Sequence, residues 1–144
     1  MSGIELIPVG LREIQAADPS GAQILILGED DGDRQFPIFI GFSEMDALDR
    51  ALHGKETARP LTHDLILNVI EEMGGRIERV IVSDLQDDTF YAKVGLRLPD
   101  GTERLIDSRP SDAMVLAARR HAPIFVAAHV LEGIGKPPPE LGFE

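Results

Sequence analysis

Apolar residues gather along the chain in short runs and alternations that predict β-strands. Residues 22–29 (AQILILGE) form a continuous apolar run of strand length, which is typical of a strand covered on both faces. Residues 89–98 alternate apolar with polar side chains, which is typical of a strand with one buried face. By these criteria we predict strands at residues 4–9, 22–29, 34–40, 76–85, 89–98, 102–107 and 124–127.

Three further segments carry apolar residues at the helical spacing of three and four. We predict helices that begin at Ser43, Thr62 and Ser111, with each hydroxyl capping the first turn. The second helix should turn an apolar stripe towards the core, formed by Leu65, Ile66, Val69, Ile70 and Met73. The third, which ends near His121, is apolar nearly all round, and this predicts a buried helix.

The order of these elements, with strands and helices in separate groups, predicts an α+β fold and not a doubly wound parallel sheet. We expect a mostly antiparallel or mixed sheet with three main helices, in one domain over residues 1–135. An Arg-Pro pair precedes two of the helices, at residues 59–60 and 109–110, which suggests an internal duplication. Residues 136–144 hold three consecutive prolines and are predicted to form an extended, mobile C-terminal tail.

Length and composition exclude several kinds of site. A chain of 144 residues can bury a core without disulfides or a structural metal. It has no cysteine, which excludes disulfides, thiolate metal sites and cysteine nucleophiles. No apolar run reaches the roughly 18 residues of a membrane span, and the N-terminus lacks the features of a signal peptide. We therefore expect a cytoplasmic protein with no membrane partner.

The chain is strongly acidic, with 25 acidic against 14 basic residues and a formal net charge of −11. This charge opposes tight, non-specific binding to a polyanion, because nucleic acid is held largely by basic residues. A small basic site remains compatible with it, since the net charge does not determine the local field. Solubility or a saline habitat would explain the acidic balance without any functional site.

A first group of candidate functional residues stands where the second helix begins. His63 could act as a general acid or base near neutral pH, and Asp64 could bind a divalent cation or orient a water molecule. Arg59 and Thr62 could bind a substrate phosphate. A structural explanation is also open, in which Asp64 favours the helix dipole and His63 is a half-buried packing residue.

A second group stands where the third helix begins. Ser111 lies at a helix start, where free backbone N–H groups bind anions, and Arg109 could hold a phosphate or carboxylate with its guanidinium fork. Asp107 and Asp112 are carboxylates suited to Mg²⁺ or Mn²⁺. The structural alternative is an internal Arg–Asp salt bridge beside an ordinary helix cap.

A third candidate is Glu44, which falls on the apolar face of the first helix. A carboxylate there is costly unless it is paired, and Arg59 and Arg109 are the partners we expect. It could also lean out to solvent from the first turn, in which case it would need no partner.

Several blocks of the sequence resemble the bifunctional nuclease family. They follow the family's order and cover about residues 4–131, nearly the whole chain. The most specific are residues 59–65 (RPLTHDL) and 107–113 (DSRPSDA); the others are residues 36–41 (FPIFIG) with Glu44, 88–92 (DTFYA) and 122–126 (APIFV). The resemblance implies hydrolysis of both DNA and RNA, with nucleic acid as the substrate.

A nuclease must neutralise the phosphate, activate water and protonate the leaving oxygen. The candidate catalytic residues are Glu44, His63, Asp64, Asp107 and Asp112, with a divalent cation, Mg²⁺ or Mn²⁺, on the aspartates; the candidate substrate-binding residues are Arg59, Thr62, Arg109 and Ser111. In so acidic a chain we expect Arg59 and Arg109 to form a small positive island.

The alternative is a non-catalytic, oligomeric binding or regulatory domain. Its polar junctions would be caps and internal salt bridges, and the apolar strand at residues 22–29 would form an interface between copies. For either function we expect a homo-oligomer, with a dimer favoured.

Overall fold

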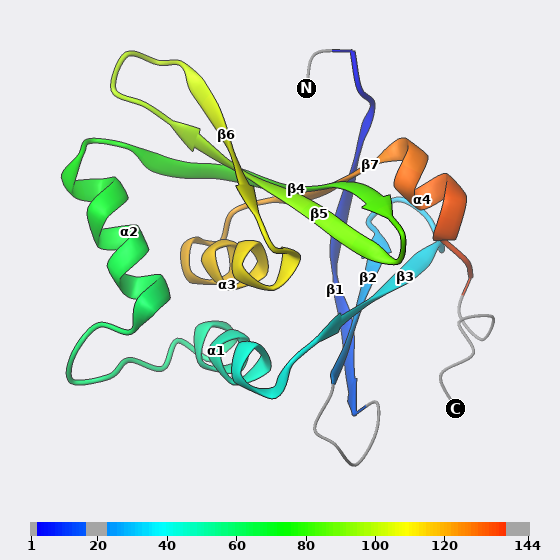
Figure 1. Cartoon of the computed structure of the whole chain (residues 1–144), viewed down its shortest axis with the longest axis horizontal. Helices are drawn as coiled ribbons and strands as arrows, with labels where there is room; N and C mark the ends of the chain where they lie inside the picture. Colours follow the sequence, from blue (N-terminus) through cyan, green and yellow to red (C-terminus); the bar gives the residue numbers. More distant parts are fainter. Residues whose placement is uncertain (1–2, 17–22, 138–144) are drawn as a thin grey trace.

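The computed structural model describes residues 3–16 and 23–137, and within them seven strands and four helices (Figure 1). The strands are β1 (Leu6–Ala16), β2 (Gln23–Glu29), β3 (Gln35–Ile40), β4 (Arg76–Gln86), β5 (Thr89–Arg97), β6 (Glu103–Ser108) and β7 (Ile124–Ala127). The helices are α1 (Phe42–Leu52), α2 (Thr62–Glu72), α3 (Pro110–Arg120) and α4 (Ala128–Ile134). No helix in this part of the chain is both long and apolar enough to cross a membrane.

The strands form one mixed sheet in the order β3-β2-β1-β7-β4-β5-β6, which confirms the predicted α+β fold. Neighbouring strands are antiparallel except for β4 and β7. Two antiparallel runs of three strands, each followed by a helix, flank β7: β1-β2-β3 with α1, and β4-β5-β6 with α3 (Figure 1). This repeated order is the one that an internal duplication predicts.

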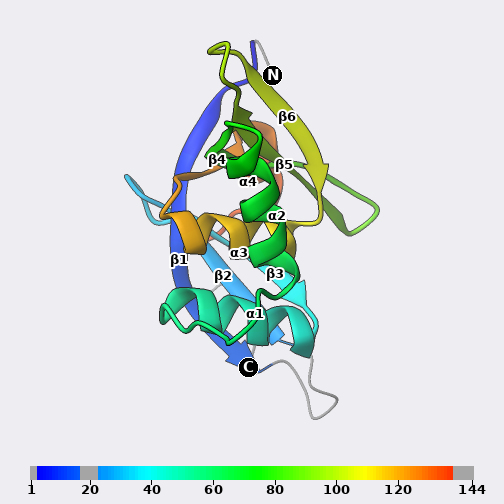
Figure 2. The ribbon, with the colours of Figure 1, turned by 90° about the vertical axis from the view of Figure 1, so that its left-hand side faces the viewer.

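The central helix of the core is α3, as its apolar composition predicts. It packs on β4 and β5 and beside α1, and its residues 110, 111 and 113–117 are buried. In Figure 2, α3 lies behind α2 with α1 below it, so the two helices that follow the strand triplets are neighbours.

The apolar run at residues 22–29 is strand β2, apart from Ala22, which lies outside the described residues. It lies between β1 and β3, and its residues 24–27 are almost fully buried on both faces. The prediction of a covered strand is confirmed. Its use as an interface between copies is wrong, because the fold of a single chain already buries these side chains.

The three predicted hydroxyl caps are not used. The N-cap residues are Gly41, Leu61 and Arg109, none of which makes a side-chain cap, so Ser43, Thr62 and Ser111 lie inside the first turns. In α3 the helix starts one residue before Ser111, because the φ of Pro110 is preset for the first helical position.

Strand β1 is longer than the predicted strand at residues 4–9, and helix α4 is absent from the prediction. β1 continues to Ala16 through an irregularity between Leu11 and Glu13 that interrupts its alternation. α4 has only seven residues, too few for a helical period to stand out.

Lys136, which begins the predicted tail, exchanges two backbone hydrogen bonds with Gln35 (2.7 and 2.9 Å). Residues 138–144 of the tail lie outside the described residues.

Helix α2 forms where predicted but turns most of its apolar stripe outwards: Leu65, Ile66, Val69 and Met73 are exposed, and Ile70 is half-buried. Leu67, which is not part of that stripe, is its one buried residue. Ion pairs hold the same side of the helix to the end of α3: Glu71 with Arg120 (2.9 Å) and Asp64 with Arg119 (3.5 Å). The predicted orientation is therefore wrong: the side that faces the rest of the fold carries Leu67 and the carboxylates that pair with Arg119 and Arg120.

A glycine in β5 lets an ion pair cross the sheet from β4 to β6. Arg79 donates to Glu103 twice, over 2.8 and 2.7 Å, and Gly95 lies between them. A Cβ on Gly95 would stand 2.6 Å from Glu103 Oε2 and 3.3 Å from the Arg79 carbonyl oxygen. The missing side chain is thus what leaves room for the pair.

We expect Gly95→Ala to lower the free energy of unfolding by about 1–3 kcal/mol, because the added methyl displaces a partly buried ion pair. Urea unfolding followed by circular dichroism measures this. The control is Gly133→Ala in α4, where a Cβ meets nothing within 4 Å and should stabilise the chain by about 0.5–1 kcal/mol. Equal changes in the free energy of unfolding for Gly95→Ala and Gly133→Ala would show that the ion pair between Arg79 and Glu103 moves aside without cost.

Candidate active site

The junction between β6 and α3 fixes the central residues of the candidate site. Because Pro110 starts the helix, Arg109 is its N-cap and Asp112 stands three residues later in the first turn. Arg109 Nε donates to Asp112 Oδ2 over 2.9 Å and Nη2 donates to Oδ1 over 3.2 Å, so the guanidinium lies side-on against the carboxylate. The Ser108 hydroxyl donates to the Arg109 carbonyl (2.8 Å) and ties down the junction.

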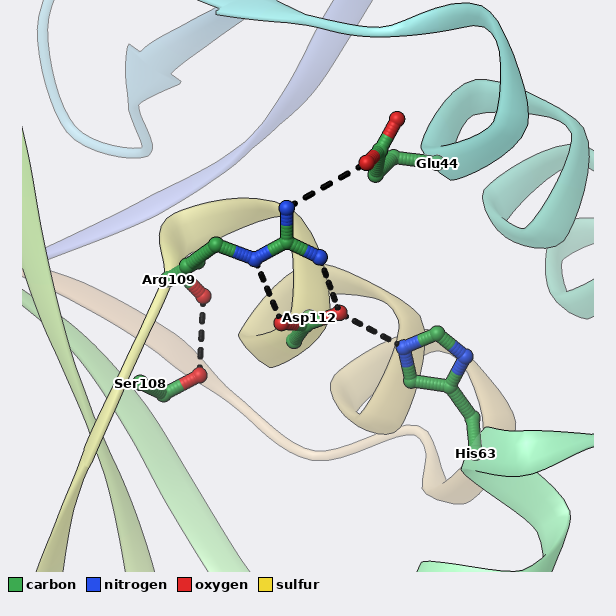
Figure 3. Close-up of polar contacts among 5 residues, drawn as sticks. All are labelled: Glu44, His63, Ser108, Arg109 and Asp112. Carbon is green, nitrogen blue, oxygen red and sulfur yellow. Dashed lines mark hydrogen bonds and ion pairs between the residues drawn. The ribbon is translucent and has the colours of Figure 1, made fainter.

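Two more helices contribute side chains to this pair (Figure 3). From α1, Glu44 Oε1 accepts from Arg109 Nη1 over 3.2 Å, which confirms one of its two expected partners. From α2, His63 Nε2 lies 2.9 Å from Asp112 Oδ1. An ionised carboxylate only accepts, so Nε2 carries the proton of this bond. The four residues, which we call the polar chain, link three helices that are distant in sequence.

The polar chain keeps Asp112 ionised. Burial alone would raise the pKa of its carboxyl group, but the hydrogen bonds from Arg109 and His63 outweigh burial and hold the pKa below the ordinary 3.8. The same hydrogen bond to Asp112, and the one to Glu44, raise the pKa of Arg109. The guanidinium therefore stays charged.

Arg109 does not form the predicted positive island. Its side chain is 63% exposed, yet it is shared between two carboxylates. Arg59, the other expected member, is exposed, and no described ion pair or hydrogen bond engages its side chain. The two arginines are not brought together, because Arg59 lies in the connector before α2.

Beside the polar chain lies an open hollow of about 320 Å³, which we call the Ser111 hollow. The N-cap residues of two helices, Gly41 and Arg109, both line it, and no side chain caps either helix. Ser111 is 8% exposed, and its hydroxyl has no hydrogen-bond partner in the described part of the chain. Free N–H groups and a free hydroxyl thus meet in one place.

A glycine shapes the edge of this hollow. The carboxylate of Glu44, at the third position of α1, folds back over Gly41, and a Cβ on Gly41 would collide with Oε2. The close approach leaves the carboxylate at the rim of the Ser111 hollow, within reach of Arg109.

Asp64 and Asp107 make no described hydrogen bond or ion pair with the polar chain. Asp64 accepts from the Leu61 N–H (3.0 Å) and pairs with Arg119, as the structural explanation of this residue expects. Asp107 is exposed and pairs with Lys93 over 3.6 Å. Thr62 is exposed in the first turn of α2.

The carboxylates that the sequence offers to a divalent cation do not meet. Asp64, Asp107 and Asp112 each bind a different basic partner. Over the residues that the structure describes, no three histidine, aspartate or glutamate side chains come together in a way that could hold a metal ion. The set of metal ligands proposed from the sequence therefore does not fit.

Sequence reasoning misses two residues of the Ser111 hollow, Asp88 and Thr89. Thr89 begins β5, and Asp88 lies in the turn before it, where Asp87 and Asp88 both adopt left-handed backbone (φ 50° and 62°). A turn is the ordinary use of such residues, so their types gave no indication of a site. The only signal was the block DTFYA at residues 88–92, which is part of the family resemblance.

Comparisons with known proteins agree with that resemblance. A sequence model described as the bifunctional nuclease domain matches residues 25–138. An uncharacterized protein of Mycobacterium tuberculosis is 40% identical over 131 residues, which cover 91% of this chain and 76% of that protein. Bifunctional nucleases 1 and 2 of Oryza sativa subsp. japonica are 27% and 29% identical over 118 and 117 residues. Each match covers 80% of this chain but 36% of the rice protein.

Proposed function

The chain belongs to the bifunctional nuclease domain family, and from this we propose that it hydrolyses phosphodiester bonds of DNA and RNA in the Ser111 hollow. The observation that carries the proposal is the meeting of two uncapped helix starts, the free hydroxyl of Ser111 and a guanidinium around one open space. These are the groups that bind a phosphate, and they come from opposite halves of the fold.

In this proposal the phosphate lies between Arg109 and the first turn of α3. The N–H groups of Ser111 and Asp112 precede the first helical hydrogen bond, which Ala113 donates to the Arg109 carbonyl over 3.1 Å. They are therefore available to the phosphate oxygens, together with the Ser111 hydroxyl. Such fixed donors stabilise the charge that develops when water attacks phosphorus.

We assign the general base to Glu44. Its carboxylate lies at the rim of the Ser111 hollow and contacts the guanidinium that would hold the phosphate, so a water beside that phosphate could give it a proton. As the water oxygen bonds to phosphorus, the bond to the leaving oxygen breaks, and solvent in the open hollow protonates that oxygen. The side chains of Asp112 and His63 have a positioning role, because they act on the phosphate only through Arg109.

A divalent cation would add charge neutralisation on the phosphate. With Glu44 acting as the base, Asp88 is the carboxylate of the Ser111 hollow that would hold it, and Mg²⁺ often binds to one or two carboxylates together with phosphate. We assign no step to Asp64 or Asp107, since their carboxylates bind Arg119 and Lys93.

The experiment is a cleavage assay on single-stranded RNA and DNA, with and without EDTA. Glu44→Gln should lower kcat by about 10²- to 10⁴-fold, because the amide cannot accept the proton from water. The matched control is Asp46→Asn on the same helix, which loses only an exposed ion pair with Arg50 and should cleave normally. Activity that survives Glu44→Gln would refute the assignment, and loss of activity in EDTA would establish the cation.

The second candidate function is a non-catalytic, oligomeric binding domain. The observation that favours it is that Arg109 already binds two carboxylates, as an internal salt bridge does. Wild-type protein that binds nucleotides without cleaving any substrate would support this function.

We also propose that the working form is a homo-oligomer, which is supported by the apolar face that α2 exposes in the single chain.

A further inference from the structure

Three aromatic side chains are well exposed in the described part of the chain: Phe39 at 60%, Phe42 at 69% and Tyr91 at 41%. Phe39 lines the Ser111 hollow, and Phe42 directly follows Gly41, which also lines it. We call Phe39 and Phe42 the aromatic pair. A single exposed apolar residue is ordinary, but two exposed rings beside one polar hollow indicate a role in binding.

The end of β3 and the start of α1 position the aromatic pair. Residues 38–41 all line the Ser111 hollow, so it runs along the outermost strand of the sheet where that strand leads into α1 (Figure 1). Ile38 and Ile40 are 3% and 7% exposed, so Phe39 presents its ring on the outer side of the strand. Phe42 begins α1, three residues later, which keeps the two Cα atoms within about 11 Å.

The charges around the hollow give a nucleic acid little net attraction. Glu44 and Asp88 line it with Arg109, whose guanidinium already binds two carboxylates. The whole chain adds a net charge of −11. Binding through phosphate alone requires a surplus of basic residues, so the affinity has to come from contacts that carry no charge. Stacking on an aromatic ring is such a contact, because every base has a π-face.

The aromatic pair can bind only bases that have left a base stack. In a duplex each base is paired and stacked, and it has to be flipped out before it can reach a side chain. In a single strand the bases are splayed out more easily. A duplex also brings twice the phosphate charge per unit length towards an acidic chain. Charge and stacking therefore favour the same form of nucleic acid.

We propose that bases beside the scissile phosphate stack on Phe39 and Phe42, so that the Ser111 hollow binds single-stranded nucleic acid in preference to duplex. The inference rests on the proposed function for the position of the phosphate. The two rings determine which form of nucleic acid is bound and take no part in breaking the bond.

The test is fluorescence anisotropy with a short labelled oligodeoxynucleotide, whose phosphorothioate linkages keep the charge and resist hydrolysis. The wild type should bind it at least about tenfold more tightly than an abasic strand of equal length or a hairpin duplex. Phe39→Leu and Phe42→Leu keep apolar bulk but lose the ring. Each should weaken binding of the base-bearing strand by about 5- to 100-fold and leave binding of the abasic strand unchanged.

The matched control is Tyr91→Leu, which removes an exposed ring from a strand. Phe90 lines the hollow, and successive side chains of a strand face opposite ways, so Tyr91 should face away from it. This variant should bind the oligodeoxynucleotide as the wild type does. Because Arg109 is the one basic residue that lines the hollow, raising the salt from about 50 to about 200 mM should weaken wild-type binding by only about threefold.

A wild type that binds the abasic and base-bearing strands equally overturns the proposal, and so do leucine variants that both bind as the wild type does. A wild type that binds neither strand leaves the aromatic pair to a protein surface and also overturns it. Hydrolysis can fail separately: base-dependent binding without cleavage of RNA or DNA refutes the nuclease function and keeps this inference. Cleavage by both leucine variants with the wild-type KM keeps the nuclease function and refutes this inference.

Discussion

Replacing Asp112 with asparagine is expected to lower kcat by about a hundredfold or more while leaving KM within about tenfold of the wild type. Asp112 accepts two hydrogen bonds from Arg109 and one from His63. An asparagine has one acceptor oxygen and an NH₂ group, which must face one of these donors. The guanidinium keeps its charge but loses its fixed direction, so phosphate still binds while the transition state is held less well.

The measurement is steady-state cleavage of single-stranded RNA by Asp112→Asn, with Asp46→Asn as the control for the same chemical change at an exposed site. Equal kcat values in the wild type and Asp112→Asn, with only the stability lowered, would show that the polar chain stabilises the fold and has no part in catalysis.

The pH dependence of stability separates the effect of Asp112→Asn on folding from its effect on catalysis. Because folding lowers the pKa of Asp112 below 3.8, its carboxylate stabilises the fold above that pH. The stability difference from Asp112→Asn should therefore vanish as the pH falls through the lower, folded-state pKa.

The fold was predictable where a local pattern and the tertiary environment agree. The apolar run at residues 22–29 and the alternation in residues 89–98 are buried and half-buried strands, and α3, which is apolar nearly all round, is the buried helix that this composition predicts. The orientation of α2 was not predictable. Its ion pairs with Arg119 and Arg120 come from a helix about 50 residues away, and periodicity holds no information on them.

The candidate site was predictable in its residue types and less so in its geometry. Sequence reasoning selected Glu44, His63, Arg109 and Asp112, and the structure brings these four together. It also selected Arg59, Asp64 and Asp107, whose side chains make no described contact with these four. Both groups stand at helix starts, so local position does not distinguish them. What separates the residues that meet from those that do not is which neighbours the sheet places beside each helix. One example is the β4–β5 hairpin, which places Asp88 and Thr89 beside the start of α3.

The placement of His63 depends on one buried side chain of α2, that of Leu67. These residues lie four positions apart and so on the same side of the helix. We expect Leu67→Ala to lower the free energy of unfolding by about 2–5 kcal/mol, because it empties the one fully buried position through which α2 packs on the body. The loosened helix should also release the hydrogen bond between His63 and Asp112, and kcat should fall by about tenfold or more.

Urea unfolding and the cleavage assay together test this dependence. Leu52→Ala on α1 is the control, since it removes the same atoms from a helical leucine that is already 44% exposed and should cost less than half as much. If α2 is held by Leu67, the ion pairs of Asp64 and Glu71 cannot replace it, because partly exposed pairs contribute about 0–1 kcal/mol each. A Leu67→Ala protein that keeps full stability would instead show that those ion pairs hold the helix. Full activity in that protein would further show that His63 reaches Asp112 without the packing of α2.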